Sequence, residues 1–411
     1  MDAKKKPNVH LEGHELFFNT LTGNWAFRPI NGYSTKYLRK DTFVPKETTE
    51  KVLSNKKNET TGKGKNASLG KARSRKNDEF YTRLEDITAE LQHYKPYFKD
   101  ATVYCPCDKL YNLGRSNFGK YFLGKFHSLG LKKLICTQYN PNGLGLAKVY
   151  DFEKCGIKWE YNGEKEDGDF VDESEIDTFF LKGNGSFDSP ECREIMKNCD
   201  IVVTNPPFSL FREFLAQIME FGKKFIILGN MDAFTYKEVF PLLRDNKIWV
   251  GYRNLNKDMY FEIPDNYKEI IVKEKKEGSG WKMIDGEVMG RLAKACWLTN
   301  LEHSKRKNRI YLSKSYTPEN YPKYDNYDAI FVKTVKDIPK DYDGVMSVPE
   351  TYLGKHNPEQ FELIDARTIT PIEKLQNKNT ALIKDADGTI NGKAKYAHIC
   401  IRKICELPTE E

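Results

Sequence analysis

The tetrapeptide Asn205-Pro206-Pro207-Phe208 is the part of the sequence best suited to chemistry. It follows the stretch 200–204, Asp-Ile-Val-Val-Thr, whose uninterrupted apolar residues predict a buried strand. The two prolines restrict their own φ angles and hold Asn205 extended, so the turn is stiff. Such a turn aims the Asn205 side-chain oxygen and the Pro206 carbonyl at one point, with the Phe208 ring beside them.

Two neighbouring acceptors suit a planar substrate that carries an exocyclic amino group. The lone pair of this amine is delocalised into the ring, which makes the nitrogen a poor nucleophile. The two acceptors would bind its two hydrogens and stabilise the positive charge that develops as a methyl group arrives. Phe208 would stack on the base. We therefore predict that residues 205–208 are catalytic, against the plainer alternative of a proline-rich turn with a core phenylalanine.

The elements around this turn alternate between strands and helices. Apolar patterns predict strands at 102–107, 133–138, 200–204, 224–229 and 247–250, and helices at 84–91, 118–129, 209–221 and 236–244, with a further helix starting at Ser189-Pro190. This order indicates a parallel, doubly wound α/β sheet, whose ligands bind beyond the carboxyl ends of the strands. After Gly251 the regularity fades, and short strands at 295–299, 329–333 and 398–402 indicate an irregular α+β region.

Positive charge is concentrated near the start of the chain. The 411 residues carry a net charge of +7, while the stretch 51–76 holds nine Lys and Arg residues against the single acid Glu59. This stretch lacks apolar periodicity and is either a solvated tether or an arm that binds phosphates. The arm would contact nucleic acid through Lys71, Arg73, Arg75 and Lys76. A second basic cluster, Lys305, Arg306, Lys307 and Arg309, is either a solvated loop or a phosphate contact.

Composition excludes several classes of protein. With 39% hydrophobic and 13% aromatic residues the chain is expected to be globular rather than disordered. Its apolar runs, such as 225–228, fall far short of the roughly 20 residues of a membrane-spanning helix. No secretion signal is seen at the N-terminus. The nine cysteines show no zinc spacing, so we expect a reduced cytoplasmic protein that needs no metal.

The catalytic turn resembles the D/N-P-P-Y/F signature of class I amino-methyltransferases that use S-adenosylmethionine. Three further stretches are similar to the EcoRI-type adenine-specific DNA methyltransferases: 77–82 (NDEFYT), 87–94 (I-x-x-E-L-Q-x-Y) and 103–108 (VYCPCD). The similarity covers about residues 71–255 and is more diffuse towards the C-terminus. It implies a Rossmann-like, doubly wound methyltransferase sheet, with an irregular α+β region that recognises the target.

The resemblance also implies which residues contact the cofactor S-adenosylmethionine. These are Phe80, Tyr81, Thr82, Tyr104, Cys105, Asp108 and Asn205, with Phe187 as a wall for the adenine of the cofactor or, equally, a core residue. Two features of the family are missing. The glycine-rich turn after the first strand is replaced by 108–117 (DKLYNLGRSN), and Gln138-Tyr139-Asn140 stands where an acidic residue often binds the ribose.

The sequence therefore predicts a DNA methyltransferase that acts on N6 of adenine in duplex DNA and flips the target base. We expect an extension at 1–50, a basic arm at 51–76, a methyltransferase domain at 77–250 and a target-recognition region at 251–411. A monomer is expected, without a membrane and without a stable complex with a partner restriction endonuclease. The alternatives are an RNA adenine methyltransferase and a non-catalytic nucleic-acid-binding protein.

Overall fold

The computed structural model describes residues 14–19, 24–29, 80–107, 117–140, 145–151, 177–370, 382–383, 388–395 and 398–404. The first two ranges are the strands β1 (His14–Asn19) and β2 (Asn24–Pro29), which pair antiparallel. The basic arm 51–76, including Lys71, Arg73, Arg75 and Lys76, lies outside the described residues. Asp108 lies outside them as well.

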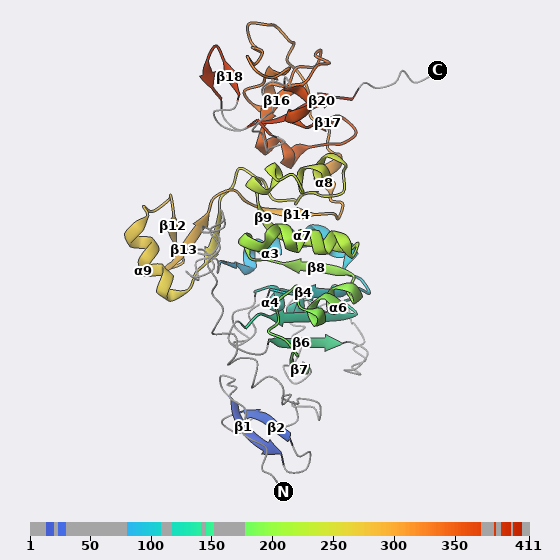
Figure 1. Ribbon diagram of the computed structural model, residues 1–411, viewed down its shortest axis with the longest axis vertical. Helices are drawn as coiled ribbons and strands as arrows, with labels where there is room; N and C mark the ends of the chain where they lie inside the picture. Colours follow the sequence, from blue (N-terminus) through green and yellow to red (C-terminus); the bar gives the residue numbers. More distant parts are fainter. Residues whose placement is uncertain are drawn as a thin grey trace, which may run out of the picture.

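An eight-stranded sheet forms the body of the molecule (Figure 1). Its order is β10 (Trp249–Val250), β14 (Ala295–Thr299), β9 (Lys224–Asn230), β8 (Ile201–Thr204), β4 (Thr102–Cys105), β5 (Lys133–Gln138), β6 (Leu146–Asp151), β7 (Asp177–Phe180). The four central strands β9, β8, β4 and β5 are parallel, and every outer pairing is antiparallel. The protein is therefore α/β with a mixed sheet.

The sheet differs from the expected parallel arrangement at both ends, and connection length explains one end. The segment 139–145 between β5 and β6 is too short for the crossover of about a dozen or more residues that a parallel pair requires. At the other end, β14 lies between β9 and β10. The stretch 295–299 was expected in the irregular region after Gly251. It is instead a buried strand of the main sheet.

Helices cover both faces of this sheet, because its apolar side chains point alternately to either side. Val103, Cys105 and the next strand's Val203 pack with α3 (Leu84–Leu91) and α4 (Asn117–Gly124). Tyr104 and Val202 pack with α6 (Pro190–Asn198) and α7 (Phe211–Glu220). The expected start of α6 is confirmed, since the Ser189 hydroxyl accepts a hydrogen bond from Cys192 N and caps the helix.

A smaller sheet projects from one side of the main sheet (Figure 1). Its order is β12 (Trp281–Ile284), β13 (Glu287–Leu292), β11 (Met259–Glu262), β3 (Tyr81–Thr82), and α9 (Asp265–Glu274) follows β11. The edge strand β3 comes from a distant part of the sequence and pairs antiparallel with β11. This pairing brings the end of the 77–82 motif, the residues Tyr81 and Thr82, to the smaller sheet.

The C-terminal region is built on a third sheet and on 3-10 turns. Its strands, in sheet order, are β15 (Ile330–Phe331), β16 (Met346–Pro349), β20 (His398–Lys403) and β17 (Phe361–Ile364), and a hairpin pairs β18 (Thr389–Ile390) with β19 (Lys393–Ala394). Its turns are η6 (Ser304–Lys307), η7 (Val335–Asp337), η8 (Glu350–Lys355) and η9 (Ala366–Ile369). It shares one hydrophobic core with α8 (Phe240–Arg244) of the main body, where Leu243 and Leu363 are both buried.

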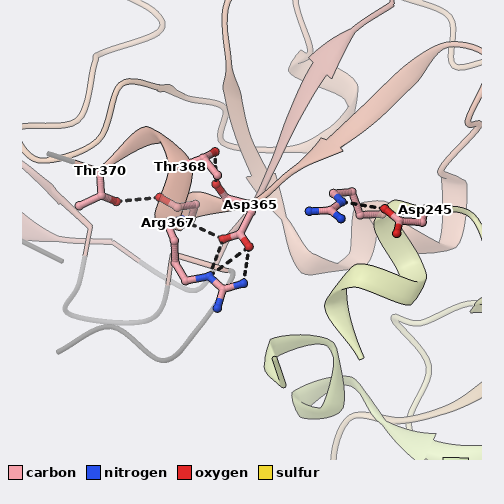
Figure 2. A network of polar contacts seen from close by, with 7 residues as sticks. Asp245, Asp365, Arg367, Thr368 and Thr370 are labelled. Atoms are coloured by element: carbon pink, nitrogen blue, oxygen red, sulfur yellow. Dashed lines mark hydrogen bonds and ion pairs between the residues drawn. The ribbon is translucent and has the colours of Figure 1, made fainter. Parts of the chain in front are cut away.

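Polar side chains organise the turns of this region. Asp365 precedes η9, and its carboxylate accepts bonds from Arg367 N (2.9 Å) and from the Arg367 guanidinium. The hydroxyls of Thr368 and Thr370 donate to backbone carbonyls of the same turn. Figure 2 shows this network beside the end of α8, where Asp245 pairs with Arg244. The turn is thus held by side-chain bonds rather than by a long helix.

Candidate active site

Asn205 stands directly after β8, at the carboxyl end of a central parallel strand, as expected. Its Nδ2 donates a 2.6 Å hydrogen bond to the Phe80 carbonyl oxygen. A carbonyl can only accept, so this bond determines which atom of the amide is nitrogen. The other amide atom, Oδ1, is buried and has no hydrogen-bond partner among the described residues. The structure therefore presents an oriented acceptor that lacks a donor.

An unsatisfied buried acceptor costs roughly 1–3 kcal/mol and is rare in native proteins. A ligand that brings an N–H group to Asn205 Oδ1 would remove that cost. The neighbouring residues suit such a ligand: Pro206 is buried, while Phe208 is half-buried at the start of the 3-10 turn η4 (Phe208–Leu210). The arrangement can bind an amino group at Asn205 Oδ1, with the half-buried Phe208 three residues along the chain.

The Phe80 carbonyl is itself held in place by a second set of contacts. Asn117, the first residue of α4, is buried, and its Nδ2 donates to Thr82 O (2.8 Å) and to Glu262 Oε1 (3.0 Å). Strand pairing adds to this, because Thr82 lies opposite Phe261 in β11. The Phe80 ring packs edge-on against the Phe261 ring, with 5.8 Å between the two ring centroids. Asn117 and Glu262 thus secure the segment that orients Asn205.

The sequence reasoning missed Asn117 and Glu262. They lie 145 residues apart, and the Asn205–Phe80 bond spans 125 residues, so no local spacing signals either contact. The sequence signal for Asn117 was its place as the last residue of the atypical stretch 108–117 that replaces the family's glycine-rich turn. That position is where a helix end faces the carboxyl edge of the sheet.

The residues that the resemblance assigned to the cofactor divide into two groups. Thr82 Oγ1 is a second buried polar atom without a hydrogen-bond partner in the described part of the chain. Together with Asn205 Oδ1 it leaves two unmatched polar atoms on segments that are bonded to each other, and this fits a polar ligand. Phe80 and Tyr81 flank Thr82 on the same segment.

The other cofactor residues lie in the core. Tyr104 is fully buried, its hydroxyl lies 2.9 Å from Thr137 Oγ1, and burial raises its pKa well above the usual value. Cys105 is also fully buried, on the opposite face of the sheet. Phe187 is 6% exposed and packs edge-on against Phe214. Their cofactor contacts stay predictions, and the side chains of Tyr104, Cys105 and Phe187 have evident packing roles.

A buried carboxylate joins the site to the segment after β10. Glu90, in α3, accepts hydrogen bonds from the Tyr94 hydroxyl (2.9 Å), Tyr252 N (2.6 Å) and Arg253 N (2.9 Å). Burial raises the Glu90 pKa, although these hydrogen bonds act in the opposite direction. Gly251 permits the close approach, because a Cβ there would lie 2.3 Å from Glu90 Oε1. Glu90 therefore ties α3 to the start of the smaller sheet.

The basic cluster in η6 contains two kinds of side chain. Arg306 is 7% exposed: it stacks over Trp249 at 3.6 Å and pairs with Glu302, and burial lowers its pKa. Lys305 is half-buried, lies 3.7 Å above the Tyr252 ring and donates to Tyr252 O. Lys307 and Arg309 are exposed. The structure therefore leaves Lys307 and Arg309 as the members of this cluster that face solvent.

Two further findings concern metals and membranes. Within the described ranges, no group of three or more His, Cys, Asp or Glu residues could hold a metal ion. The described helices also include none that is long and apolar enough to cross a membrane.

The chain is similar in sequence to known proteins. Residues 68–404 match the family model described as adenine-specific methyltransferase EcoRI. The chain is 42% identical over 339 residues to the type II methyltransferase M.EcoRI of Escherichia coli, which covers 82% of this chain and 96% of the relative. It is 37% identical over 342 residues to the type II methyltransferase M.MpnI of Mycoplasma pneumoniae, covering 82% of this chain and 98% of the relative. No solved structure matches significantly.

Proposed function

Because the chain belongs to the EcoRI family of adenine-specific methyltransferases, we propose that it methylates N6 of adenine in duplex DNA at a specific site. Both relatives named above are type II methyltransferases by name, and they are matched over nearly their whole length. The buried Asn205 Oδ1, which has no hydrogen-bond partner among the described residues, supports Asn205 as the catalytic residue. It is an acceptor at the position where the family's chemistry needs one.

The methyl donor of such an enzyme is S-adenosylmethionine, which supplies an electrophilic methyl group. Thr82, with its unmatched hydroxyl, and the flanking Phe80 and Tyr81 would hold the donor beside Asn205. Asp108, which follows β4 in the sequence, would add a carboxylate. The orphaned polar atoms fit this ligand, and no metal is part of the proposal.

Asn205 acts on the adenine amine in this mechanism. Its Oδ1 and the Pro206 carbonyl accept the two N6 hydrogens, which draws the nitrogen towards a tetrahedral shape and directs its lone pair at the methyl group. The methyl carbon would leave the sulfonium sulfur of the donor, which becomes a neutral thioether, and would bond to N6, which would then lose one proton to water. Because the Phe80 carbonyl already fixes the amide, little reorganisation is needed as positive charge develops.

The target adenine must leave the duplex to reach this acceptor, so we propose that the base is flipped and stacked on Phe208. The Rossmann-like core with its central parallel strands would form the methyltransferase domain at 77–250, to which β14 adds a strand. The region 251–411 would recognise the target, with Lys307, Arg309 and the arm residues Lys71, Arg73, Arg75 and Lys76 on phosphates. The enzyme would act as a cytoplasmic monomer on the nucleoid, without a stable complex with a cognate endonuclease.

The test compares Asn205→Ala with Asn198→Ala. Asn198 is an exposed residue of α6 whose amide bonds within its own turn. We expect Asn205→Ala to lower the rate of methyl transfer to duplex DNA by about 100-fold or more, as removal of an oxyanion-hole donor does. Binding of S-adenosylmethionine, measured by calorimetry, should change only a few-fold. Asn198→Ala should match the wild type.

Single-molecule sequencing of DNA from cells that express the protein would identify the modified base and its sequence together. N6-methyladenine at a recurrent motif is the expected result, lost in Asn205→Ala. A full rate in Asn205→Ala would contradict the catalytic assignment. Methylation of RNA in competition with duplex DNA would favour the RNA methyltransferase instead, and absence of cofactor binding by the wild type would favour a non-catalytic protein.

A further inference from the structure

A solvent-open groove of about 710 Å³ lies on the C-terminal region. Arg309, Tyr311, Lys340 and Lys403 are among the residues that line it, together with Gln360. Of these, Arg309 belongs to the basic cluster recognised in the sequence. Tyr311 lies on the same segment as Arg309, while Lys340, Gln360 and Lys403 come from three other segments, which the fold brings to one place.

Tyr311 is exposed to an unusual degree. Its exposed fraction is 88%, the highest among the large hydrophobic side chains of the described residues. Other tyrosines of the same region, such as Tyr321, Tyr324 and Tyr327, are no more than 6% exposed. Exposed aromatic surface beside positive charge is typical of sites that bind nucleic acid, where rings stack on bases and cations contact phosphates.

The segment that carries Tyr311 is held firmly. The buried Gln360 side chain accepts a hydrogen bond from Ile310 N (2.7 Å) and donates one to Ile310 O (2.8 Å). Asn357, which is 1% exposed, donates to Lys307 O (3.1 Å). Two buried amides therefore fix the backbone on the N-terminal side of Tyr311, and its exposure is a feature of the fold.

Three cations line the groove around Tyr311: Arg309, Lys340 and Lys403. In the described part of the chain, no carboxylate forms an ion pair with Lys340 or Lys403. Lys403 Nζ donates to the Lys340 carbonyl (3.0 Å), which brings the two lysines together. Of the adjacent acids, Asp341 accepts from Tyr316 N and Glu362 pairs with Arg402. The groove thus offers cations to an anionic partner.

We propose that this groove binds the DNA substrate, with Arg309, Lys340 and Lys403 on phosphates and Tyr311 stacked on a base. The partner is duplex DNA that is locally distorted, because extrusion of the target adenine leaves neighbouring bases with an uncovered face. A tyrosine ring has only two rotatable side-chain bonds, so it can cover such a face without losing much conformational entropy. The inference rests on the proposed DNA methyltransferase activity and adds a contact site to it.

The test measures the affinity of purified full-length variants for duplex DNA by fluorescence anisotropy at several salt concentrations. One duplex contains the methylation motif identified by sequencing, and a second lacks it. Tyr311→Ala should weaken binding to the motif duplex by roughly 5- to 150-fold, the range for loss of one base-stacking contact. Tyr311→Phe keeps the ring and should stay within about two-fold of the wild type.

The lysines are tested through the salt dependence. The double variant Lys340→Ala/Lys403→Ala should reduce the log–log salt slope by about 1.8, since each phosphate contact contributes about 0.9. Lys99→Ala is the matched control, because Lys99 is exposed and precedes β4, at the opposite edge of the sheet from Asn205. It should leave affinity and slope unchanged. Thermal melting would verify that all variants are folded.

The outcomes separate the two proposals. If the wild type binds and methylates duplex DNA but Tyr311→Ala and the double lysine variant bind it as the wild type does, the groove proposal is wrong and the methyltransferase assignment stands. If the wild type neither binds nor methylates duplex DNA, the proposed function itself is wrong. Equal losses in Tyr311→Phe and Tyr311→Ala would also contradict stacking, since the two differ in the ring.

Discussion

The main sheet and the C-terminal region position their functional side chains in different ways. In the main sheet, Asn205 is placed by the end of β8, a strand whose residues are all buried between helical layers. In the C-terminal region, Tyr311 lies on an irregular extended segment, which buried amide side chains fasten to the body. Regular backbone bonds determine the first position and individual side-chain bonds the second.

This difference has a physical consequence for how each region responds to change. The backbone of a strand in a sheet is held by many hydrogen bonds, so loss of one side chain leaves the position of the backbone unchanged. A segment held by one or two side chains depends on each of them, because removal of a partner leaves buried polar groups unsatisfied. The two regions should therefore respond differently to changes of pH and to single substitutions.

The C-terminal region should lose stability in weak acid. His356 is buried against the Tyr352 hydroxyl, and burial lowers its pKa to about 4. The unfolded chain binds a proton near pH 6.5, so stability is complete above that pH and falls as the pH drops towards 4. The full loss is about 3 kcal/mol. Denaturant unfolding at pH 7.5 and pH 5 should show about 2 kcal/mol of this loss.

His356→Gln provides the control for this effect. A glutamine does not ionise in this range, so the variant should be less stable at pH 7.5 but flatter between pH 6.5 and pH 4. If its pH dependence equals that of the wild type, another group dominates and the assignment to His356 fails.

Asn117→Ala should reduce turnover through the Phe80 carbonyl. The substitution removes the donor to Thr82 O and Glu262 Oε1, a loss of about 2 kcal/mol, and frees the segment that orients Asn205. We expect kcat to fall roughly 10- to 100-fold while KM for DNA changes less. Gln92→Ala, which removes an exposed amide bonded within its own turn, should leave both constants unchanged.

Asn117→Asp distinguishes positioning from general damage. Its carboxyl group can donate a hydrogen bond only while protonated, so kcat should recover partly as the pH is lowered, unlike that of Asn117→Ala. Parallel pH profiles for the two variants would show that Asn117 has a purely structural role.

Arg306 and Lys307 are neighbours in η6 and should behave in opposite ways. Arg306→Ala removes a buried guanidinium from Trp249 and should lower the free energy of unfolding by about 1–2 kcal/mol. Lys307→Ala should leave stability within about 0.5 kcal/mol and reduce the salt slope of DNA binding by about 0.9. Denaturant unfolding and anisotropy titrations measure the two effects. If Arg306→Ala reduces the salt slope of DNA binding without loss of stability, the structural role assigned to Arg306 is wrong.

The type of chemistry and much of the fold around it could be predicted from short-range patterns in the sequence. Apolar runs predicted buried strands at 200–204 and 224–229, where β8 and β9 lie, the consecutive prolines indicated a stiff turn, and the motifs indicated the family that the comparison confirms. These inferences hold because they depend on short-range properties. The φ restriction of proline, the burial of a continuous apolar run and the cap at Ser189 each act within a few residues.

The tertiary structure brings together atoms that are distant in the sequence. The Phe80 carbonyl orients Asn205, Asn117 holds Thr82, and β14 enters the main sheet from beyond residue 251. It also buried Arg306 while exposing Lys307, although the two cations are adjacent in the sequence. Contacts of this kind depend on strand order and on the packing of distant segments, so they follow from the energy of the whole fold rather than from local spacing.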